Sequence, residues 1–377
     1  MPPSTHASSS LLTHFETLED PRTVYLVEHP LLDIVALTIC AIICGAETWE
    51  EIEAYGQSKG DWLKTFLGLP NGIPSHDTIS RVFALLEPSQ LQECFVSWVK
   101  SIAELSFGEV VSIDGKSARH SYDKGKGKGA IHMVSAWASE NQLVLGQVKV
   151  ADKSNEITAI PRLLDILEVS GCIVTIDAMG AQKDIAKQII DQGADYVLSL
   201  KGNQGTLHKD VQQLFDWADK TEFKDIEHEA YQTLDKGHGR LEIRRYWLLD
   251  NVEHLKNAQQ WQGLKRVGII ESERRIEGKP TTRERRYYLT SLDGGIEQFA
   301  YASRGHWGIE NKLHWSLDVV FHEDDSRIRN GHAPENMTVM RKIALNLLAK
   351  ESSKGSKKAK RLKAGWDNDF LIQVLLA

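Results

Sequence analysis

The chain has few cysteines, no long apolar run and no excess of positive charge. Its four cysteines among 377 residues lack the close paired spacing of a zinc ribbon or a disulfide framework. Buried thiols in a reducing compartment are expected, although Cys40 and Cys44, one helical turn apart, leave a two-ligand metal site open. The longest apolar stretch, residues 34–46, is shorter than the roughly 20 residues that span a bilayer. Residues 1–10 lack the basic start and apolar core of a signal peptide, so we expect a cytoplasmic protein with no membrane partner.

The net charge of −7 argues at first sight against a nucleic-acid partner. The basic residues are nevertheless concentrated in a few segments, and much of the acidic excess lies elsewhere. These segments are residues 116–128, 236–245, 274–286 and 350–363. A single charge run is commonly a solvated face, but several basic segments in one acidic chain strengthen the case for an anionic partner.

The length of the chain predicts two or three domains, and its first 106 residues have helical patterning. Buried helices are expected at residues 31–44, 77–86 and 91–105. The second of these follows a turn-rich break at residues 68–74 and carries Ser80 and Arg81 on its polar side. This helix could enter a DNA groove as in a helix-turn-helix unit, or it could simply pack in a helical bundle.

Residues 107–350 change to a mixed α/β pattern. Strands are expected at residues 110–113, 131–137, 142–150, 172–176 and 196–200, with helices at 156–167 and 181–192. Three strands followed by alternating helices and strands is the chain order of the ribonuclease H-like fold. Helical spacing returns at residues 298–317 and 335–349. Residues 351–377 are expected to form a basic, polar linker and a short apolar tail.

Residues from about 202 to 293 interrupt this domain. After a helix near residues 207–218, alternating segments rich in arginine and aromatic residues predict antiparallel strands, and hence a β insertion. These segments are residues 241–249, 267–275 and 283–289. The aromatic side chains in or beside them can serve either strand packing or base stacking. They are Trp247, Trp261, Tyr287 and Tyr288.

Two of the predicted strands end in an aspartate, Asp114 and Asp177. Sites in open α/β sheets form at the carboxyl ends of the strands, so these two carboxylates are expected at one sheet edge. Hard divalent cations such as Mg²⁺ prefer carboxylate oxygens. A third carboxylate from a later helix would complete a two-metal site suited to phosphoryl transfer, and Glu310 is the natural candidate.

For other polar residues near these positions, a structural role and a functional role are both considered. His306, Glu310 and His314 share one helix face, but the His-Glu-x-x-His zinc motif is absent, so helix packing or phosphate contacts are expected for the histidines. Glu156 begins a helix, where it either stabilises the helix dipole or supports the metal ligands from outside. Lys201 and its neighbours either form a turn or contact a phosphate.

The motifs of the chain resemble those of DDE-type insertion-sequence transposases, specifically the group that contains the H-repeat-associated proteins of Rhs elements. The resemblance runs nearly end to end. It rests on Ser112-Ile113-Asp114-Gly115-Lys116, Lys153-Ser154-Asn155-Glu156-Ile157, Thr175-Ile176-Asp177-Ala178-Met179-Gly180-Ala181-Gln182, Lys201-Gly202-Asn203-Gln204 and His306-Trp307-Gly308-Ile309-Glu310-Asn311. In the N-terminal region it rests on Asp20-Pro21-Arg22, Cys44-Gly45-Ala46 and Gly72-Ile73-Pro74-Ser75-His76-Asp77-Thr78.

The resemblance implies that Asp114, Asp177 and Glu310 are the catalytic, metal-binding triad and that they hold two Mg²⁺ or Mn²⁺ ions. It implies a ribonuclease H-like core with a β insertion before the glutamate helix. The reaction would be hydrolysis at transposon ends to free a 3′-OH, followed by attack of that hydroxyl on target DNA. Acting on two DNA ends implies at least a dimer in the DNA complex, located at the nucleoid.

Residues that contact DNA are harder to assign, because the chain departs from the related signature Tyr-x₂-Arg-x₃-Glu-x₆-Lys. Tyr301 and Arg304 keep their spacing, but His306 stands in the place of the arginine and Leu317 in that of the lysine. The candidates for DNA contact are Arg81, Lys116, Lys201, Asn203, Gln204, Arg304, His306 and Lys312.

Two alternatives to a transposase stay open. A structure-selective nuclease on the same fold would cut branched DNA without joining strands. A domesticated or inactive descendant would bind DNA without catalysis.

Overall fold

The computed structural model describes residues 9–122, 125, 127–151, 154–224, 226–237, 239–250 and 252–377. Residues 1–8, Lys124 and Lys126 of the first basic segment, and Lys153 of the second motif lie outside the described residues. No helix within the described ranges is long and apolar enough to cross a membrane.

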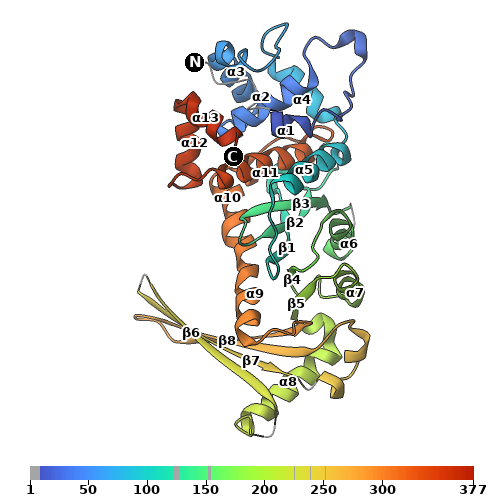
Figure 1. Ribbon diagram of the computed structural model, residues 1–377, viewed down its shortest axis with the longest axis vertical. Coiled ribbons are helices and arrows are strands. Elements are labelled where there is room, and N and C mark those ends of the chain that lie inside the picture. The colour runs from blue at the N-terminus through green and yellow to red at the C-terminus, as the bar shows by residue number, and fades with distance from the viewer. Residues whose placement is uncertain are drawn as a thin grey trace.

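Helices make up the N-terminal part of the molecule (Figure 1). They are α1 (Ser9–Thr13), α2 (Leu31–Ile43), α3 (Trp49–Leu63), α4 (His76–Leu85) and α5 (Pro88–Ile102). The three expected helices correspond to α2, α4 and α5. Local signals fix two of the helix starts, since Thr48 and Glu51 form a capping box on α3 and the Ser75 hydroxyl accepts a hydrogen bond from the Thr78 amide of α4.

Within the described residues, nine strands form one sheet in the order β3-β2-β1-β4-β5-β9-β8-β7-β6. The strands expected in the core are β1 (Val110–Ser117), β2 (His132–Ala138), β3 (Leu143–Lys149), β4 (Ile173–Ile176) and β5 (Asp195–Leu200). β1, β4 and β5 are parallel, whereas β2 and β3 are antiparallel additions. Helices α6 (Glu156–Ile166) and α7 (Lys183–Asp191) lie on one side of the sheet and α9 (Ile296–Gly308) on the other (Figure 1).

The segment expected as an insertion extends this sheet instead of forming a separate unit. It contains α8 (Gly205–Lys220), β6 (His228–Gly237), β7 (Arg240–Leu249), β8 (Arg266–Ile276) and β9 (Thr282–Thr290). β9 pairs antiparallel with β5, so the backbone hydrogen bonds run without a break from the core into the insertion. The strand β6 was not expected, because most of its side chains are exposed and give no apolar pattern.

The inner half of the inserted strands is apolar on both faces. On one face Tyr246, Ile270 and Tyr288 pack in a cluster with Phe299 of α9. On the other face Trp247, Val267 and Leu289 belong to the main core. Trp261, Tyr287 and Tyr288 are less than a tenth exposed, so these aromatic side chains mainly pack the fold. The outer half projects from the body of the molecule (Figure 1).

A long helix follows the insertion, as expected, but it is interrupted. After α9 the chain makes a π-helical turn, η7 (Ile309–His314), before α10 (Trp315–Val319). Single π turns inside helices are often found at functional sites. Glu310 lies on this turn.

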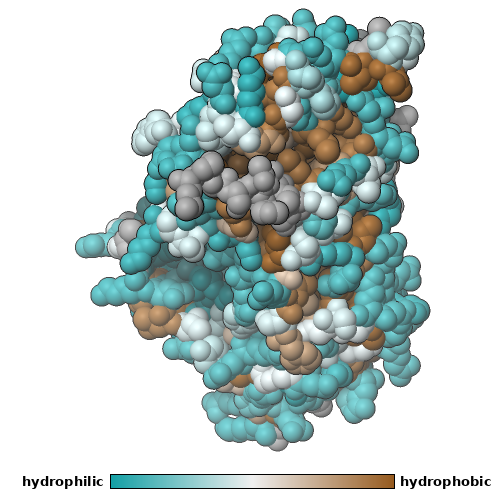
Figure 2. Space-filling view, turned by 45° about the horizontal axis from the view of Figure 1, so that its top comes forward, coloured by the Kyte–Doolittle hydropathy of each residue, from teal (hydrophilic) through white to brown (hydrophobic). Residues whose placement is uncertain are grey.

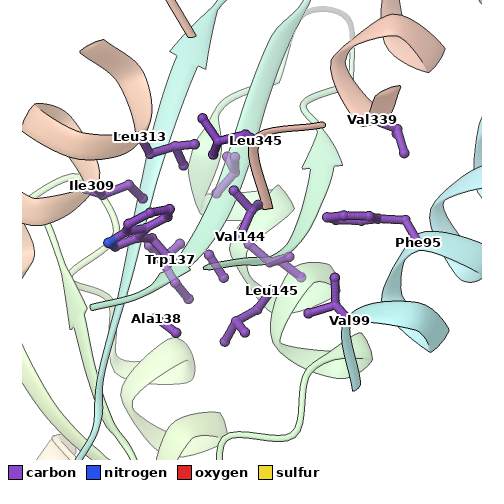
Figure 3. Packing of buried hydrophobic residues seen from close by; sticks show 14 of the residues in the cluster. Phe95, Val99, Trp137, Ala138, Val144, Leu145, Ile309, Leu313, Val339 and Leu345 are labelled. Atoms are coloured by element: carbon purple, nitrogen blue, oxygen red, sulfur yellow. The ribbon is translucent and has the colours of Figure 1, made fainter. Parts of the chain in front are cut away.

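Helix α11 (Ala333–Lys350) joins the N-terminal helices to the sheet. It is buried along nearly its whole length. Figure 3 shows Val339 and Leu345 of α11 in one core with Phe95 of α5 and Val144 of β3. The N-terminal helices and the sheet therefore share a continuous hydrophobic core.

The expected basic linker at the C-terminus is wrong, since it forms helix α12 (Lys357–Trp366), which is followed by α13 (Asn368–Leu375). The Arg361 side chain is buried, and its guanidinium donates to the carbonyls of Ile42 in α2 and Val320 after α10. It also lies 4.4 Å from the ring centroid of Phe321. The basic composition suggested that this segment is exposed to solvent. A guanidinium can nevertheless be buried when backbone carbonyls accept hydrogen bonds from it.

Replacing Arg361 should therefore loosen the C-terminal helices. Arg361→Ala removes the guanidinium donors to the Val320 and Ile42 carbonyls and the packing against Phe321, and we expect it to lower the free energy of unfolding by about 3 kcal/mol. Lys358→Ala, at an exposed position of the same helix, should change it by less than about 0.5 kcal/mol. Urea denaturation followed by circular dichroism measures both, and equal midpoints for the two variants would contradict this account.

Candidate functional site

Asp114 and Asp177 lie side by side in the sheet, as expected, because β1 and β4 are parallel with Ile113 opposite Ile176. Asp177 directly follows β4, but the expectation that the other strand ends at Asp114 is wrong: β1 continues to Ser117, since it stays paired with β2 beyond the end of β4. Glu310 comes from η7. All three carboxylates line one cleft of about 370 Å³, which extends to β9.

The three carboxylates and a fourth one act on each other electrostatically. Burial is the largest of the effects that raise the pKa of Asp114 to about 7; the negative charges of Glu156, Asp177 and Glu310 add to it, while the Gly115 amide opposes the shift. An uncompensated cluster of this kind favours a bound cation. Within the described ranges, however, no three metal-ligating side chains stand close enough together to form a ready-made site.

The loop after β4 is held by hydrogen bonds from its own backbone and from the motif Lys201-Gly202-Asn203-Gln204. One oxygen of Asp177 accepts hydrogen bonds from the amides of Met179 (3.0 Å) and Gly180 (3.2 Å). Asn203 donates to the Ala178 carbonyl (2.6 Å), and Gln204 donates to the Ala181 carbonyl (3.0 Å). The amides of Asn203 and Gln204 therefore hold the loop that positions Asp177, and their contact with DNA stays a prediction.

Glu156 is the first residue of α6, and its charge also acts on Asp114. Its carboxylate is 2.7 Å from Nε2 of His132. A Cβ atom on Gly115 would overlap both of these side chains, which explains the glycine directly after Asp114. The N-cap of α6 is Asn155, whose side chain accepts from the Ile157 amide. Of its two expected roles, Glu156 fits the one close to the carboxylate cluster.

His306 and His314 face inward. Nδ1 of His306 is 3.0 Å from the Thr175 hydroxyl, and burial lowers the pKa of His306 to about 4. Nδ1 of His314 is 3.6 Å from the Asp114 carboxylate, and burial lowers the pKa of His314 to about 3. Both rings are neutral at pH 7. The neutral ring of His306 is hydrogen-bonded to Thr175 of β4 and so joins α9 to the sheet, and its contact with DNA stays a prediction.

Lys116 forms ion pairs within the protein. Its ammonium group lies 2.7 Å from Asp318, 3.1 Å from Glu323 and 3.2 Å from Asp324, and its side chain is only 11% exposed. Three carboxylates already neutralise this charge within the protein, and a DNA contact of Lys116 stays a prediction. These ion pairs fasten β1, two residues after Asp114, to the segment that follows the Glu310 helix.

A second cleft, which we call the arginine groove, adjoins the first. Its lining includes Arg240, Arg244, Arg274, Arg286, Arg304 and Lys312, against the carboxylates Glu242 and Glu284. Glu284, Arg286 and Trp307 line both clefts. Figure 2 shows a hydrophilic hollow between the projecting part of the molecule and its body.

Of the remaining candidates for DNA contact, three are exposed at or near these clefts. Arg304 and Lys312 are exposed and line the arginine groove. Lys201 is exposed and lines the carboxylate cleft. Arg81 is exposed on α4 and lines neither cleft. Arg286 was not among the predicted DNA contacts. Its guanidinium lies 4.6 Å from the Trp307 ring centroid. The alternating arginines along β7–β9 are the sequence pattern that could have indicated it.

Comparison with known proteins identifies the class. Residues 105–347 match the family model described as "Transposase DDE domain", and residues 12–99 match "DDE_Tnp_1-associated". The chain therefore belongs to the DDE transposase family, and this membership implies a ribonuclease H-like fold, with which the mixed sheet is consistent.

Individual relatives indicate which group of DDE transposases the chain resembles. The chain is 44% identical over 370 residues to "H repeat-associated putative transposase YhhI" of Escherichia coli (strain K12), covering 97% of each chain. It is 45% identical over 245 residues to "H repeat-associated putative transposase YbfD" of the same strain, covering 65% of this chain and 96% of the relative. "Inactive transposase YbfQ", also from that strain, is 50% identical over 72 residues, or 19% of this chain and 86% of the relative. The resemblance to the H-repeat-associated group is thus confirmed.

The raised pKa of Asp114 predicts a pH-dependent penalty on folding when no divalent metal is present. The native pKa of about 7 exceeds the unfolded value of roughly 3.9. Stability is therefore unaffected below about pH 4 and falls as the pH rises through about 7. Asp114→Asn removes this loss, at most about 4 kcal/mol.

The measurement is the difference in Tm between Asp114→Asn and the unmodified protein, followed from pH 4 to pH 8 in a chelator. We expect the Tm of the variant to rise relative to the Tm of the unmodified protein over this interval. Asp184→Asn, at an exposed position of α7, is the matched control and should give a flat difference. A flat difference for Asp114→Asn as well would show that its carboxyl is not perturbed.

Proposed function

We propose that the protein is an active DNA transposase that cleaves transposon ends and transfers the freed strands to target DNA. Asp114, Asp177 and Glu310 would hold two Mg²⁺ or Mn²⁺ ions. The observation that carries the proposal is the placement of these three carboxylates around one cleft, with the pKa of Asp114 raised by burial and by its acidic neighbours.

The donor set fits hard divalent cations, since it consists of carboxylate oxygens in a cleft open to water. When bound, such ions would activate a water or a 3′-OH and stabilise the leaving oxygen of a phosphodiester. Asp177 keeps one oxygen free after its other oxygen has accepted two backbone hydrogen bonds. The neutral rings of His306 and His314 add no positive charge that would compete with a cation.

The arginine groove supports DNA as the substrate. It continues from the carboxylate cleft through Arg286 and Trp307, so a DNA strand lying in the groove would lead to the carboxylates. Arg304 and Lys312 are exposed in the groove, and Lys201 is exposed in the cleft. Phosphate contacts of this kind position DNA without reading its sequence. Because two ends must be processed together, the working complex would contain at least two copies at the nucleoid.

Loss of any one of the three carboxylates should abolish catalysis without unfolding the protein. Asp114→Asn, Asp177→Asn and Glu310→Gln are each expected to lower cleavage of inverted-repeat ends in Mn²⁺ by about a thousandfold or more. Glu297→Gln, an exposed carboxylate on α9, is the matched control and should retain activity. Cleavage is measured on end-labelled duplexes, with Tm as the check on folding.

The same assay separates the alternatives. Cleavage followed by joining supports the transposase. Cleavage without joining would indicate a nuclease, and tight binding without cleavage would indicate an inactive descendant. Full activity in all three carboxylate variants would refute the proposed site.

Neutralising the arginine groove should weaken DNA binding regardless of sequence. Arg304→Gln and Lys312→Gln are each expected to reduce the slope of log affinity against log salt concentration by about 1. Lys64→Gln, an exposed lysine after α3, removes the same charge elsewhere and should leave the slope unchanged. Fluorescence anisotropy over a salt series measures all three, and equal slopes throughout would place the DNA elsewhere.

A further inference from the structure

The outer half of the sheet has a second charged face, opposite to the arginine groove. Side chains alternate between the two faces of a strand, and the groove takes Arg244, Arg274 and Arg286 from β7, β8 and β9. The residues next to them along each strand point the other way. In register on that far face stand Arg245, Glu271, Glu273, Arg275, Arg283 and Arg285.

Glu273 is the centre of this face. It is fully buried, yet three arginines contact its carboxylate: Arg275 (2.7 Å), Arg283 (3.1 Å) and Arg245 (3.3 Å). Hydrogen bonds and charges from these arginines lower the pKa of Glu273, so it is ionised at pH 7. One carboxylate thus holds three guanidinium groups in place.

The charges of the far face balance at its inner end but not at its outer end. At the inner end, Arg285 pairs with Glu271 (2.9 Å) and with Asp219 (2.7 Å) and Asp216 (3.8 Å) of α8. At the outer end, Arg275 and Arg283 share the single carboxylate of Glu273 with Arg245, which also donates to Glu271 (3.1 Å). Like charges held this close repel each other, and the excess is compensated when an anion binds.

The arginines are also presented in a way that suits phosphates. Hydrogen bonds to buried glutamates hold each guanidinium in place, while the side chains of Arg275 and Arg283 remain 53% and 65% exposed. A guanidinium has five N–H donors, and these contacts use only some of them. Little side-chain entropy is then lost when a phosphate is bound. The projecting strands leave this face open beyond α8 (Figure 1).

We propose that the outer end of this far face, built on Arg245, Arg275 and Arg283, binds the phosphate backbone of a second DNA duplex while the first occupies the arginine groove. The proposal rests on the proposed function. Guanidinium contacts to phosphates carry no sequence information, so the face would take a duplex of any sequence. That is the property required of target DNA and not of the transposon ends.

The test uses the full-length double variant Arg275→Gln/Arg283→Gln. The protein is first saturated with an unlabelled inverted-repeat end, and binding of a labelled duplex of unrelated sequence is then followed over a salt series. We expect the affinity for the second duplex to fall about tenfold at moderate salt and the salt slope to decrease by about 2. Affinity for the end and its cleavage should stay unchanged, which also shows that the variant is folded.

The matched control is Arg162→Gln/Lys64→Gln, which removes two charges from exposed positions of α6 and the end of α3. Unchanged capture of the second duplex by the far-face variant would overturn the inference, as would an equal loss in the control. An equal loss of end binding would overturn it too, because the two faces would then not be separate sites. If the unmodified protein fails to cleave ends, the proposed function fails, while binding of the unrelated duplex still reports on the far face.

Discussion

Mutual repulsion among carboxylates is the constraint around which the proposed catalytic region is arranged. The parallel pairing of β1 with β4 brings Asp114 and Asp177 to the same level of the sheet, and the helix after the insertion adds Glu310 to the same cleft. Such a cluster costs folding free energy until a cation joins it. The fold tolerates it because the hydrogen bonds and apolar contacts of the strands beneath are independent of the charges at their ends.

The position of Glu310 depends on a second set of charges. Lys116 draws Asp318, Glu323 and Asp324 towards β1, and these residues follow the Glu310 turn in the chain. Glu323 in turn lies 4.0 Å from the buried Arg341 of α11. Because a buried ion loses much when one partner is removed, this network resists displacement of the helix from the strand. The first and third carboxylates are therefore tied together by residues outside the proposed metal-binding triad.

The sequence predicts the core strands and the first two acidic residues because the signals are local. An apolar run before an aspartate encodes the strand and the position of its carboxylate, although β1 continues to Ser117. The partners of Lys116, Asn203 and His306 within the fold were not foreseen because no local pattern reveals them, and for Lys116 that partner lies about 200 residues away. A polar side chain next to a site looks the same in the sequence whether protein or ligand satisfies it. The same ambiguity made α12 look like a linker.

The π turn at Glu310 and the continuity of the sheet were equally invisible to periodicity. Residues 298–317 keep helical spacing across the turn, and the inserted strands alternate as any antiparallel strands do. Continuity has a mechanical consequence. Because β9 is hydrogen-bonded to β5, the groove and the far face are fixed relative to the carboxylates by the same backbone ladder that builds the core. An acidic chain can in this way present two rigid basic surfaces beside its acidic cleft, with its glutamates holding the arginines in position.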